Sequence, residues 1–502
     1  MESYTGSSND VTAEGDSREL DRSFFHSIAW SGGVKWAVQL VGWVSTIFVA
    51  RILTPADYGL MGMATLYLSF VTVVGGLGLG AGIVALRHLS EKQIAQVHTT
   101  STLLGAAWLG LSLVLAVPIG RFYRSPELPA VVAVMSLTFL IGGLRTVPLA
   151  LLQRGLRFKR LALFDGLQGL VLAAATLVAA AAGARYWALV IGALASALVY
   201  TVCILWSHPE AFRWPRWGDI REVMTFGTHL LIGRTCWYVY TNADFLIAGK
   251  VLGKASLGAY AFAWSLASIA VEKVSALVTG VTPSYFAKMQ DDKPELRRYL
   301  LALTRGIALL TFPTTIGIGL VAPEFVRVVL GSKWEGAIVP LQLLAFYASF
   351  RSISTFLSQI LAAVGDTRFA MMNGFLGVAV LPLSFFIGSH WGIVGIASAW
   401  VVAYPIVIAP IYHRVFRLIQ LRPSEYLRNL WPVASSTGLM ILLVSAARAA
   451  IPYGWPPGLR LGILIITGAA TYGGCLRIFF PQTVVGLRRL VGRGSATRAT
   501  KT

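Results

Sequence analysis

Apolar stretches of about twenty residues recur along nearly the whole chain, and short polar segments separate them. A stretch this long with few charges predicts a membrane-spanning helix, because it matches the thickness of the bilayer core. No large polar domain interrupts the series, so the pattern predicts an all-α polytopic membrane protein. We expect about fourteen spans, over residues 27–50, 59–86, 99–120, 128–152, 161–182, 186–206, 223–249, 257–283, 300–321, 338–363, 369–388, 391–412, 429–447 and 461–480.

The charged residues add an orientation to this pattern. Lys and Arg number 42 against 22 Asp and Glu, which gives a net charge of +20. Such a charge is also typical of nucleic-acid-binding proteins. Here, however, the cations lie in short loops between apolar spans, with about 26 on the side of the two termini and about 10 on the other side. Because Lys and Arg concentrate in cytoplasmic loops, both termini are predicted to face the cytoplasm, and no nucleic-acid partner is expected.

One of the basic loops has the sequence LLQRGLRFKR, residues 151–160. It carries no acid and four cations, which are Arg154, Arg157, Lys159 and Arg160. A cytoplasmic position accounts for these cations as orienting charges. We also expect them to attract anionic lipid at a cytoplasmic entrance, since each such cation contributes about 1 kcal/mol toward acidic headgroups.

Two parts of the chain are similar at a constant offset. ARILTPADYGLMGMA (residues 50–64) aligns without a gap with GKVLGKASLGAYAFA (residues 249–263), and GLRFKR (155–160) resembles DTRFAM (366–371). The matching segments occupy corresponding places in two groups of six spans. Two six-span repeats keep the same orientation, which implies a pseudo-two-fold axis along the membrane normal and a cavity between two lobes. This arrangement is typical of transporters.

The spans and the repeat together predict the organisation of the chain. We expect a disordered cytoplasmic tail (1–26), an N-lobe of six spans (27–206), a cytoplasmic linker (207–222), a C-lobe of six spans (223–418), two further spans (429–480) and a basic cytoplasmic tail (481–502).

Ionisable side chains inside the spans are candidate functional residues, because a charge in the bilayer is costly. The cations among them are Lys35, Arg145, Arg234, Lys273, Arg305 and Arg351. The acids are Asp165, Asp244 and Glu272. Those nearest to span ends, for which the alternative is that they reach the membrane surface, are Arg145, Asp165, Asp244 and Arg305.

The excess of cations over acids predicts a cavity that binds an anion. A diphosphate fits, because guanidinium groups pair with phosphate oxygens. The alternative is internal pairing, for example between Glu272 and a cation on another helix. The three acids are also the candidates for coupling transport to an ion gradient.

The sequence carries no motif for a cofactor, a metal ion or ATP. GGLGLGAG (residues 75–82) looks like a dinucleotide fingerprint but follows an apolar helical run rather than a strand, so we interpret it as a place of close helix packing or a bend. No GxxxxGK[ST] sequence is present, so ATP hydrolysis is not expected. Cys203, Cys236 and Cys475 lie in apolar runs without metal-ligand spacing.

Several motifs resemble those of a known family. ARILTPADYGLMGMA, LLQRGLRFKRLALFD (151–165) and WALVIGALASALVY (187–200) are similar to the polysaccharide-exporter branch of the MOP superfamily, which includes Wzx-type flippases and colanic-acid and teichuronic-acid exporters. The turn from Arg51 through Asp57 and Tyr58 to Gly59 matches a hallmark of that branch. The resemblance covers residues 24–418, whereas the last two spans match only in hydropathy.

The resemblance implies a MATE-like, V-shaped fold of two six-helix lobes plus two C-terminal helices, in a bacterial inner membrane. It implies a flippase, not an enzyme, that moves a polyprenyl-diphosphate-linked oligosaccharide from the cytoplasmic to the outer leaflet by alternating access. It further implies that cavity arginines hold the diphosphate, that a groove by the two extra helices takes the lipid tail, and that a polysaccharide polymerase and chain-length machinery are partners.

Two other functions stay open at this point. A multidrug or cation antiporter of the same fold would favour acids in its cavity, whereas cations outnumber acids in these spans. A membrane glycosyltransferase or polymerase would need a sizeable outer loop with catalytic residues, but the longest outer loop here, residues 321–337, holds only Glu324 and Glu335 as acids. The sequence therefore favours the flippase.

Overall fold

The computed structural model describes residues 38–76, 78–86, 88–279, 282, 285–286, 289, 292–452 and 454–481. Within these ranges the side chains of residues 226–234, 236, 276–279 and 367 are not described. The predicted N-terminal tail and nearly all of the predicted C-terminal tail lie outside the described residues.

Most of the described residues are helical, and among them eleven helical segments are long and apolar enough to cross a membrane. A shorter apolar helix, Val38–Ile52, precedes them. The elements are α2 (Pro55–Gly75), α3 (Leu79–Ala85), α4 (Glu91–Tyr123), α5 (Leu128–Met135), α6 (Leu137–Arg154), α7 (Phe158–Ala181), α8 (Trp187–Ser207), α9 (Trp217–Thr241), α10 (Ala243–Ile247), α11 (Gly253–Thr279), α13 (Lys293–Phe325), α14 (Ile338–Ala363), α15 (Thr367–Gly388), α16 (Gly392–Leu418), α17 (Pro423–Ala450) and α18 (Pro457–Phe479). The all-α membrane fold predicted from the sequence is confirmed.

Some helices begin or end at other residues than the predicted spans, because a glycine or a capping residue ends the helix within the apolar stretch. The span predicted over 59–86 is two helices, because the chain turns between α2 and α3 at Gly78, whose φ of 63° lies in the left-handed region that glycine favours. The predicted bend in the glycine-rich stretch is thus confirmed. At the start of α4, Ser90 and Gln93 form a reciprocal cap, in which each backbone N–H donates to the other's side chain.

The helices group into two compact units. Among the described residues, the first unit lies within 38–52, 71–117 and 130–231, and the second within 53–70, 118–129 and 232–481. In the first unit α7 and α8 pack side by side, and α6 packs against α8 and α3. A core cluster joins α3, α6 and the start of α9 through Ile83, Val147 and Val223.

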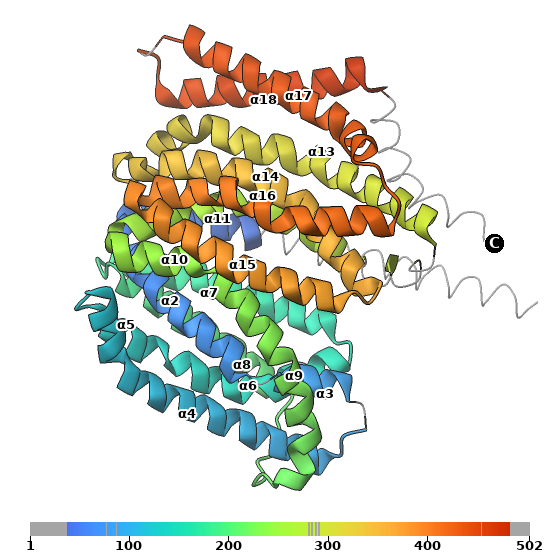
Figure 1. Ribbon diagram of the computed structural model, residues 1–502. Helices are drawn as coiled ribbons and strands as arrows, with labels where there is room; N and C mark the ends of the chain where they lie inside the picture. The colour runs from blue at the N-terminus through green and yellow to red at the C-terminus, as the bar shows by residue number, and fades with distance from the viewer. Residues whose placement is uncertain are drawn as a thin grey trace, which may run out of the picture. The chain divides into compact units, whose positions relative to one another are not determined.

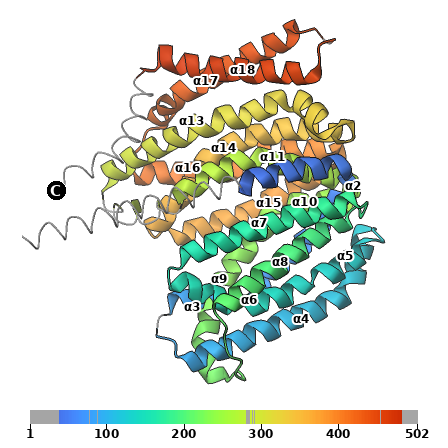
Figure 2. The same cartoon turned by 180° about the vertical axis from the view of Figure 1, so that it is seen from behind.

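The second unit contains the larger core. Its buried cluster joins α13, α14, α16 and α17 through residues such as Leu300, Phe356, Val415 and Val433. The helices α17 and α18 form a hairpin that lies along α13 (Figures 1 and 2). The two C-terminal helices expected from hydropathy are therefore present and packed.

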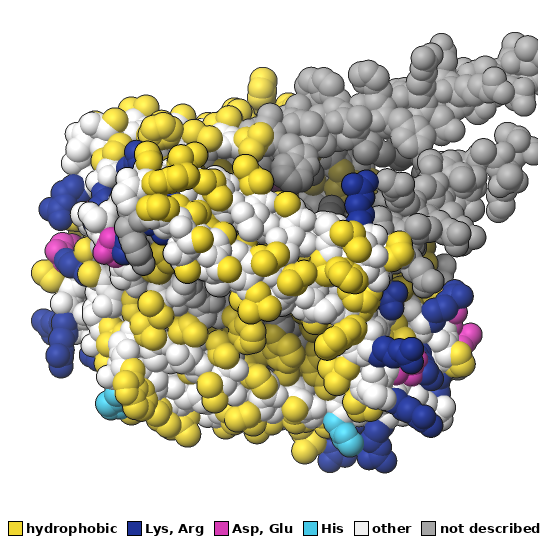
Figure 3. Space-filling view, turned by 90° about the horizontal axis from the view of Figure 1, so that it is seen from above, with side chains coloured by type: hydrophobic (Ala, Val, Ile, Leu, Met, Phe, Trp, Pro, Cys, Tyr) yellow, Lys and Arg dark blue, Asp and Glu magenta, His cyan; other side chains and the backbone are white. Residues whose placement is uncertain are grey.

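The surface agrees with a position in a membrane. Lys and Arg side chains gather at the ends of the helices, and hydrophobic side chains cover much of the surface between them (Figure 3). Large apolar side chains such as Val114, Val178 and Ile466 are about 70% exposed. Such exposure is favourable in lipid, which solvates apolar groups.

Candidate substrate cavity

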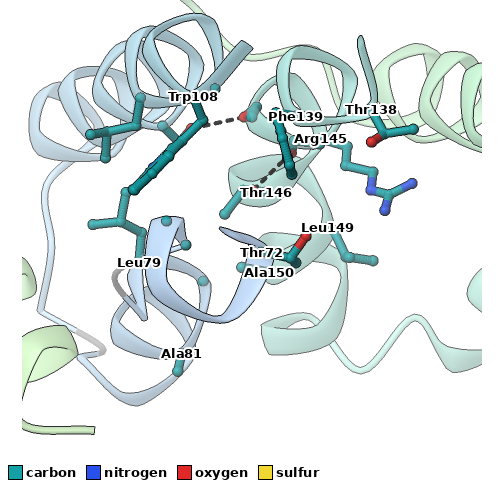
Figure 4. Close-up of a pocket in the computed structure, with 18 of the residues that line it drawn as sticks. Thr72, Leu79, Ala81, Trp108, Thr138, Phe139, Arg145, Thr146, Leu149 and Ala150 are labelled. Carbon is teal, nitrogen blue, oxygen red and sulfur yellow. Dashed lines mark hydrogen bonds between the residues drawn. The ribbon is translucent and has the colours of Figure 1, made fainter. Parts of the chain in front are cut away.

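The first unit contains an open cavity of about 740 Å³ between α2, α3, α4 and α6. This volume lies within the range of small-molecule sites, about 300–1,000 Å³. Figure 4 shows Trp108 of α4 and Leu79 of α3 on one side, and the α6 residues Thr146 and Leu149 on the other. The cavity is mostly apolar, with a few hydroxyls and one cation in its lining.

Glycines allow the helices that form the walls of this cavity to pack closely against one another. A Cβ at Gly75 would overlap the indole of Trp108, so only glycine lets the indole lie against the end of α2. Gly105 of α4 faces the backbone of Phe139, and Gly143 of α6 faces that of Ser101. The Ser101 hydroxyl donates to the Gly143 carbonyl oxygen at 2.9 Å. Small residues of this kind allow membrane helices to approach closely.

Arg145 of α6 is the cation in the lining of the cavity. Its guanidinium carbon lies 5.4 Å from the centre of the Tyr200 ring of α8, a cation–π distance. The Tyr200 hydroxyl interacts with the Asp165 carboxylate of α7. The structure thus connects two of the candidate residues, Arg145 and Asp165, through a tyrosine that the sequence analysis did not single out.

The second unit holds Arg351 of α14 in an aromatic setting. Its guanidinium carbon lies 5.4 Å from the Trp264 ring and 5.9 Å from the Tyr347 ring. One Nη atom donates to the Ser268 hydroxyl at 3.5 Å. Trp264 also contacts Trp400 of α16, with ring centres 5.3 Å apart. These rings and the half-buried cation form a polar and aromatic group between α11, α14 and α16.

Asp244 of α10 lies beside this group. Its Oδ2 accepts hydrogen bonds from the Tyr260 hydroxyl at 2.6 Å and from the Trp400 indole N–H at 2.9 Å. Its Oδ1 has no hydrogen-bond partner among the described residues. Asp244 is fully buried within the protein. Tyr347 interacts electrostatically with both Asp244 and Arg351.

The other candidate residues do not belong to the cavity lining or to the group around Arg351 as far as they are described. Lys35 lies outside the described residues, and the side chain of Arg234 is not described. Glu272 and Lys273 are exposed on α11. Arg305 donates from Nε to the Asn429 carbonyl oxygen at 3.2 Å, which joins α13 to α17. Within the part of the chain that is described, the candidate cations are therefore spread over both units rather than gathered in one.

The basic loop predicted over 151–160 comprises the end of α6, a turn over 155–157 and the start of α7. Arg157, Lys159 and Arg160 are exposed, and Arg154 is half-buried. The loop turns tightly, since Leu156 has a φ of 54° and the Arg157 N–H donates to the Leu152 carbonyl oxygen at 3.0 Å. Arg160 reaches the Ser207 hydroxyl at the end of α8, at 3.4 Å. An exposed cluster of this kind is open to anionic headgroups.

An ion cluster in the second unit was missed in the sequence analysis. Arg448 of α17 binds the two carboxylate oxygens of Glu324 at 3.1 and 2.8 Å, and Arg460 of α18 lies 4.0 Å from the same carboxylate. The sequence placed Glu324 in an outer loop, whereas it lies buried in α13. The sequence feature that could have predicted this position is the apolar run, which continues past residue 321.

The family to which the chain belongs follows from a comparison with known proteins. The family described as polysaccharide biosynthesis protein matches residues 48–339, which is more than half of the chain. The chain belongs to this family. It is a multi-pass membrane protein of the polysaccharide exporter and flippase family with the MOP-superfamily fold, and therefore a transporter rather than an enzyme.

Curated relatives cover most of the chain. It is 24% identical over 421 residues to the lipopolysaccharide biosynthesis protein WzxC of Escherichia coli, an alignment that covers 80% of this chain and 83% of that one. It is 26% identical over 429 residues to the teichuronic acid biosynthesis protein TuaB of Bacillus subtilis, which covers 84% and 88%. The resemblance inferred from the motifs is confirmed.

Solved structures show the same fold. An inward closed conformation of the lipid II flippase MurJ matches with a TM-score of 0.73 at 14% identity, covering 90% of this chain and 99% of that one. An inward-facing multidrug resistance transporter of the MATE family matches with a TM-score of 0.62 at 14% identity, covering 76% and 96%. At this identity the two likenesses establish the fold alone.

Proposed function

We propose that the chain moves a polyprenyl-diphosphate-linked oligosaccharide from the cytoplasmic to the outer leaflet by alternating access. The observation that carries the proposal is the cavity of about 740 Å³, whose described lining holds one cation, Arg145, and no acid. A diphosphate needs a fixed cation, and a saccharide needs space, hydroxyls and an aromatic face. The hydroxyls come from three threonines, Thr72, Thr138 and Thr146, and the aromatic face comes from Trp108.

The other candidate cations have additional roles in this proposal. Arg351, held over Trp264 and Tyr347, is a second anion-binding group, and Arg154, Arg157, Lys159 and Arg160 collect substrate at a cytoplasmic entrance. Lys35, Arg234, Lys273 and Arg305 remain members of the proposed set. The cytoplasmic side of the two termini, the six-plus-six lobes and a polymerase partner are part of the same proposal.

Among the acids, Asp244 is the best supported candidate for coupling to an ion. It is fully buried, and its Oδ1 lacks a hydrogen-bond partner among the described residues. A buried carboxylate in a membrane is costly unless it is protonated or paired, so proton or cation binding there carries a large free energy. Asp165 and Glu272 are both exposed, which makes them weaker candidates.

The test is complementation of a strain that lacks this gene. We expect wild type to restore surface glycan, and Arg145→Ala to leave lipid-linked oligosaccharide on the cytoplasmic leaflet. Arg145→Lys should restore export in part, because it keeps the charge but loses the fork geometry. Arg428→Ala, at an exposed position of α17, is the matched control and should export normally.

A different result in the deletion strain would indicate an antiporter instead. If surface glycan persists in the deletion strain but the cells become sensitive to cationic drugs, the chain is an antiporter and the proposal is wrong. Asp244 with its open oxygen is the feature that would then carry function, and Asp244→Asn should remove drug resistance.

A further inference from the structure

The two repeated segments found in the sequence contact each other in the second unit. Gly59 of α2 and Gly258 of α11 cross with their backbones in contact. A Cβ on Gly59 would overlap the carbonyl oxygen of Lys254, and a Cβ on Gly258 would overlap that of Pro55. The partners in each of the pairs Gly59–Gly258 and Pro55–Lys254 are 199 positions apart. The contact is therefore symmetrical, as an axis relating the two repeats requires.

No side chain larger than hydrogen fits at either glycine. The obstructing atoms belong to backbone rather than to flexible side chains, so they have no rotamer by which to move away. Only a separation of the two helices would accommodate a methyl group at this crossing. Small-residue crossings of this kind hold membrane helices together mainly by van der Waals contact.

The hallmark turn before Gly59 builds the first half of this crossing. Thr54 caps α2, and its backbone N–H and hydroxyl both donate to Asp57 Oδ2, at 2.9 and 2.7 Å. Tyr58 packs edge-on against Phe262 and Trp334, with ring centres 5.7 and 5.3 Å away. Each of these residues thus positions the backbone that Gly258 contacts.

Polar bonds to neighbouring segments lie beside the crossing. Lys254 donates to Glu127 at 2.7 Å, and both side chains are about a third exposed or more. Pairs with this exposure contribute about 0–1 kcal/mol. The Tyr238 hydroxyl donates to the Leu66 carbonyl oxygen at 2.7 Å. A crossing made by backbone contact, with an exposed ion pair beside it, is suited to repeated opening.

We propose that the Gly59–Gly258 crossing is the outer closure of the transport path, which separates once in every cycle. This inference rests on the proposed alternating access and on the cytoplasmic position of both termini, which places residues 51–57 and 249–253 on the outer side. Gly59 and Gly258 are positioning residues in this account. They touch no substrate, but their bare backbones let the outer ends of the two repeats meet.

A reversible cross-link tests the proposal. The Cβ position of Gly62 lies 3.5 Å from Cδ2 and 3.7 Å from Cγ of Leu257, so cysteines at these two positions fall within disulfide reach. Gly62→Cys with Leu257→Cys is built in a chain whose three native cysteines are replaced by Ser. We expect oxidation to stop glycan export and a reductant to restore it.

A second cross-link is the matched control. The Cβ position of Gly468 lies 3.4 Å from Val444 Cγ2, so Val444→Cys with Gly468→Cys joins α17 to α18 within one hairpin. Its oxidation should leave export unchanged. Full export by a completely oxidised Gly62–Leu257 pair overturns the closure, and so does failure of that pair to form while the control pair forms.

A glycine substitution tests whether the crossing closes the outer side of the membrane. Gly59→Ala should hold the crossing apart, so that a single cysteine at Leu257, which is 1% exposed here, becomes reactive toward a membrane-impermeant maleimide added outside, while export falls. Unchanged reactivity with normal export contradicts the closure. If the cysteine-free parent moves no glycan at all, the proposed function fails instead, and the two failures are thereby distinguished.

Discussion

Single residues explain why the family's hallmark turn has its sequence. Thr54, Pro55, Asp57, Tyr58 and Gly59 each have a structural role at the start of α2. Thr54 and Asp57 form a capping box, Pro55 occupies the first helical turn, and Gly59 allows the crossing with α11. We therefore assign this motif to the scaffold of the transporter rather than to its substrate site.

The capping role of Asp57 predicts a loss of stability. Asp57→Ala removes the acceptor of the Thr54 N–H and hydroxyl, so we expect the free energy of unfolding to fall by about 1 kcal/mol. Thermal unfolding of the purified protein in detergent measures this change. Glu91→Ala, which removes an exposed first-turn acid of α4, is the matched control and should have a smaller effect.

A second residue-scale prediction concerns pH. The hydrogen bond from Lys254 holds the pKa of Glu127 below its usual range. A lowered carboxyl pKa in the folded state stabilises it at pH above the ordinary carboxyl value, and this contribution is lost as pH falls through the lowered value. Glu127→Gln should thus lower Tm slightly at neutral pH.

The difference in Tm between wild type and Glu127→Gln should disappear in acid, where Glu127 of the wild type is protonated. Both side chains of the pair are partly exposed, so the expected effect is within about 1 kcal/mol. A Tm difference that grows as pH falls would contradict this assignment.

At the scale of elements, the hairpin of α17 and α18 is fastened to α13 along its length. Arg297 pairs with Glu425 near one end, Asn429 donates to the Leu301 carbonyl oxygen, and Arg448 pairs with Glu324 near the other end. We infer that these three helices move as one body.

Arg448→Ala should loosen this hairpin. It leaves the nearly buried Glu324 without its bidentate partner, so we expect a loss of up to about 3 kcal/mol and faster proteolysis of the α17–α18 hairpin. Glu324→Gln in the same background should recover part of the loss by removing the uncompensated charge. Equal stability of Arg448→Ala and wild type would show that the pair does not fasten the hairpin.

Helices were the part of the fold that sequence predicted best. The predicted span 338–363 coincides with α14, because a long apolar run in a membrane has no alternative to helix. The pairing of Gly59 with Gly258 was visible as an alignment, but their contact was not. The sequence named Arg145 as a cavity cation but expected the cavity between two lobes, because the place of the observed cavity depends on helices that are distant in sequence.

At the scale of the whole molecule, we propose two parts of one transporter: a mostly apolar cavity with Arg145 in its lining, and a closure between the repeats. We propose that Arg145 and the basic loop bind an anionic lipid and that the glycine crossing allows alternating access. The family is shared with polysaccharide biosynthesis proteins such as WzxC, and the fold is shared with MurJ and a MATE transporter. The central claim that remains to be measured is that the chain itself moves a lipid-linked glycan across a bilayer.

The most direct measurement uses the purified chain in liposomes that contain a polyprenyl-diphosphate-linked oligosaccharide. A lectin added outside reports the glycan in the outer leaflet over time. The account predicts that wild type carries the inner-leaflet pool to the outside, that Arg145→Ala does so much more slowly, and that Arg428→Ala matches wild type. Glycan that stays in its original leaflet with active, correctly folded wild type would contradict the account.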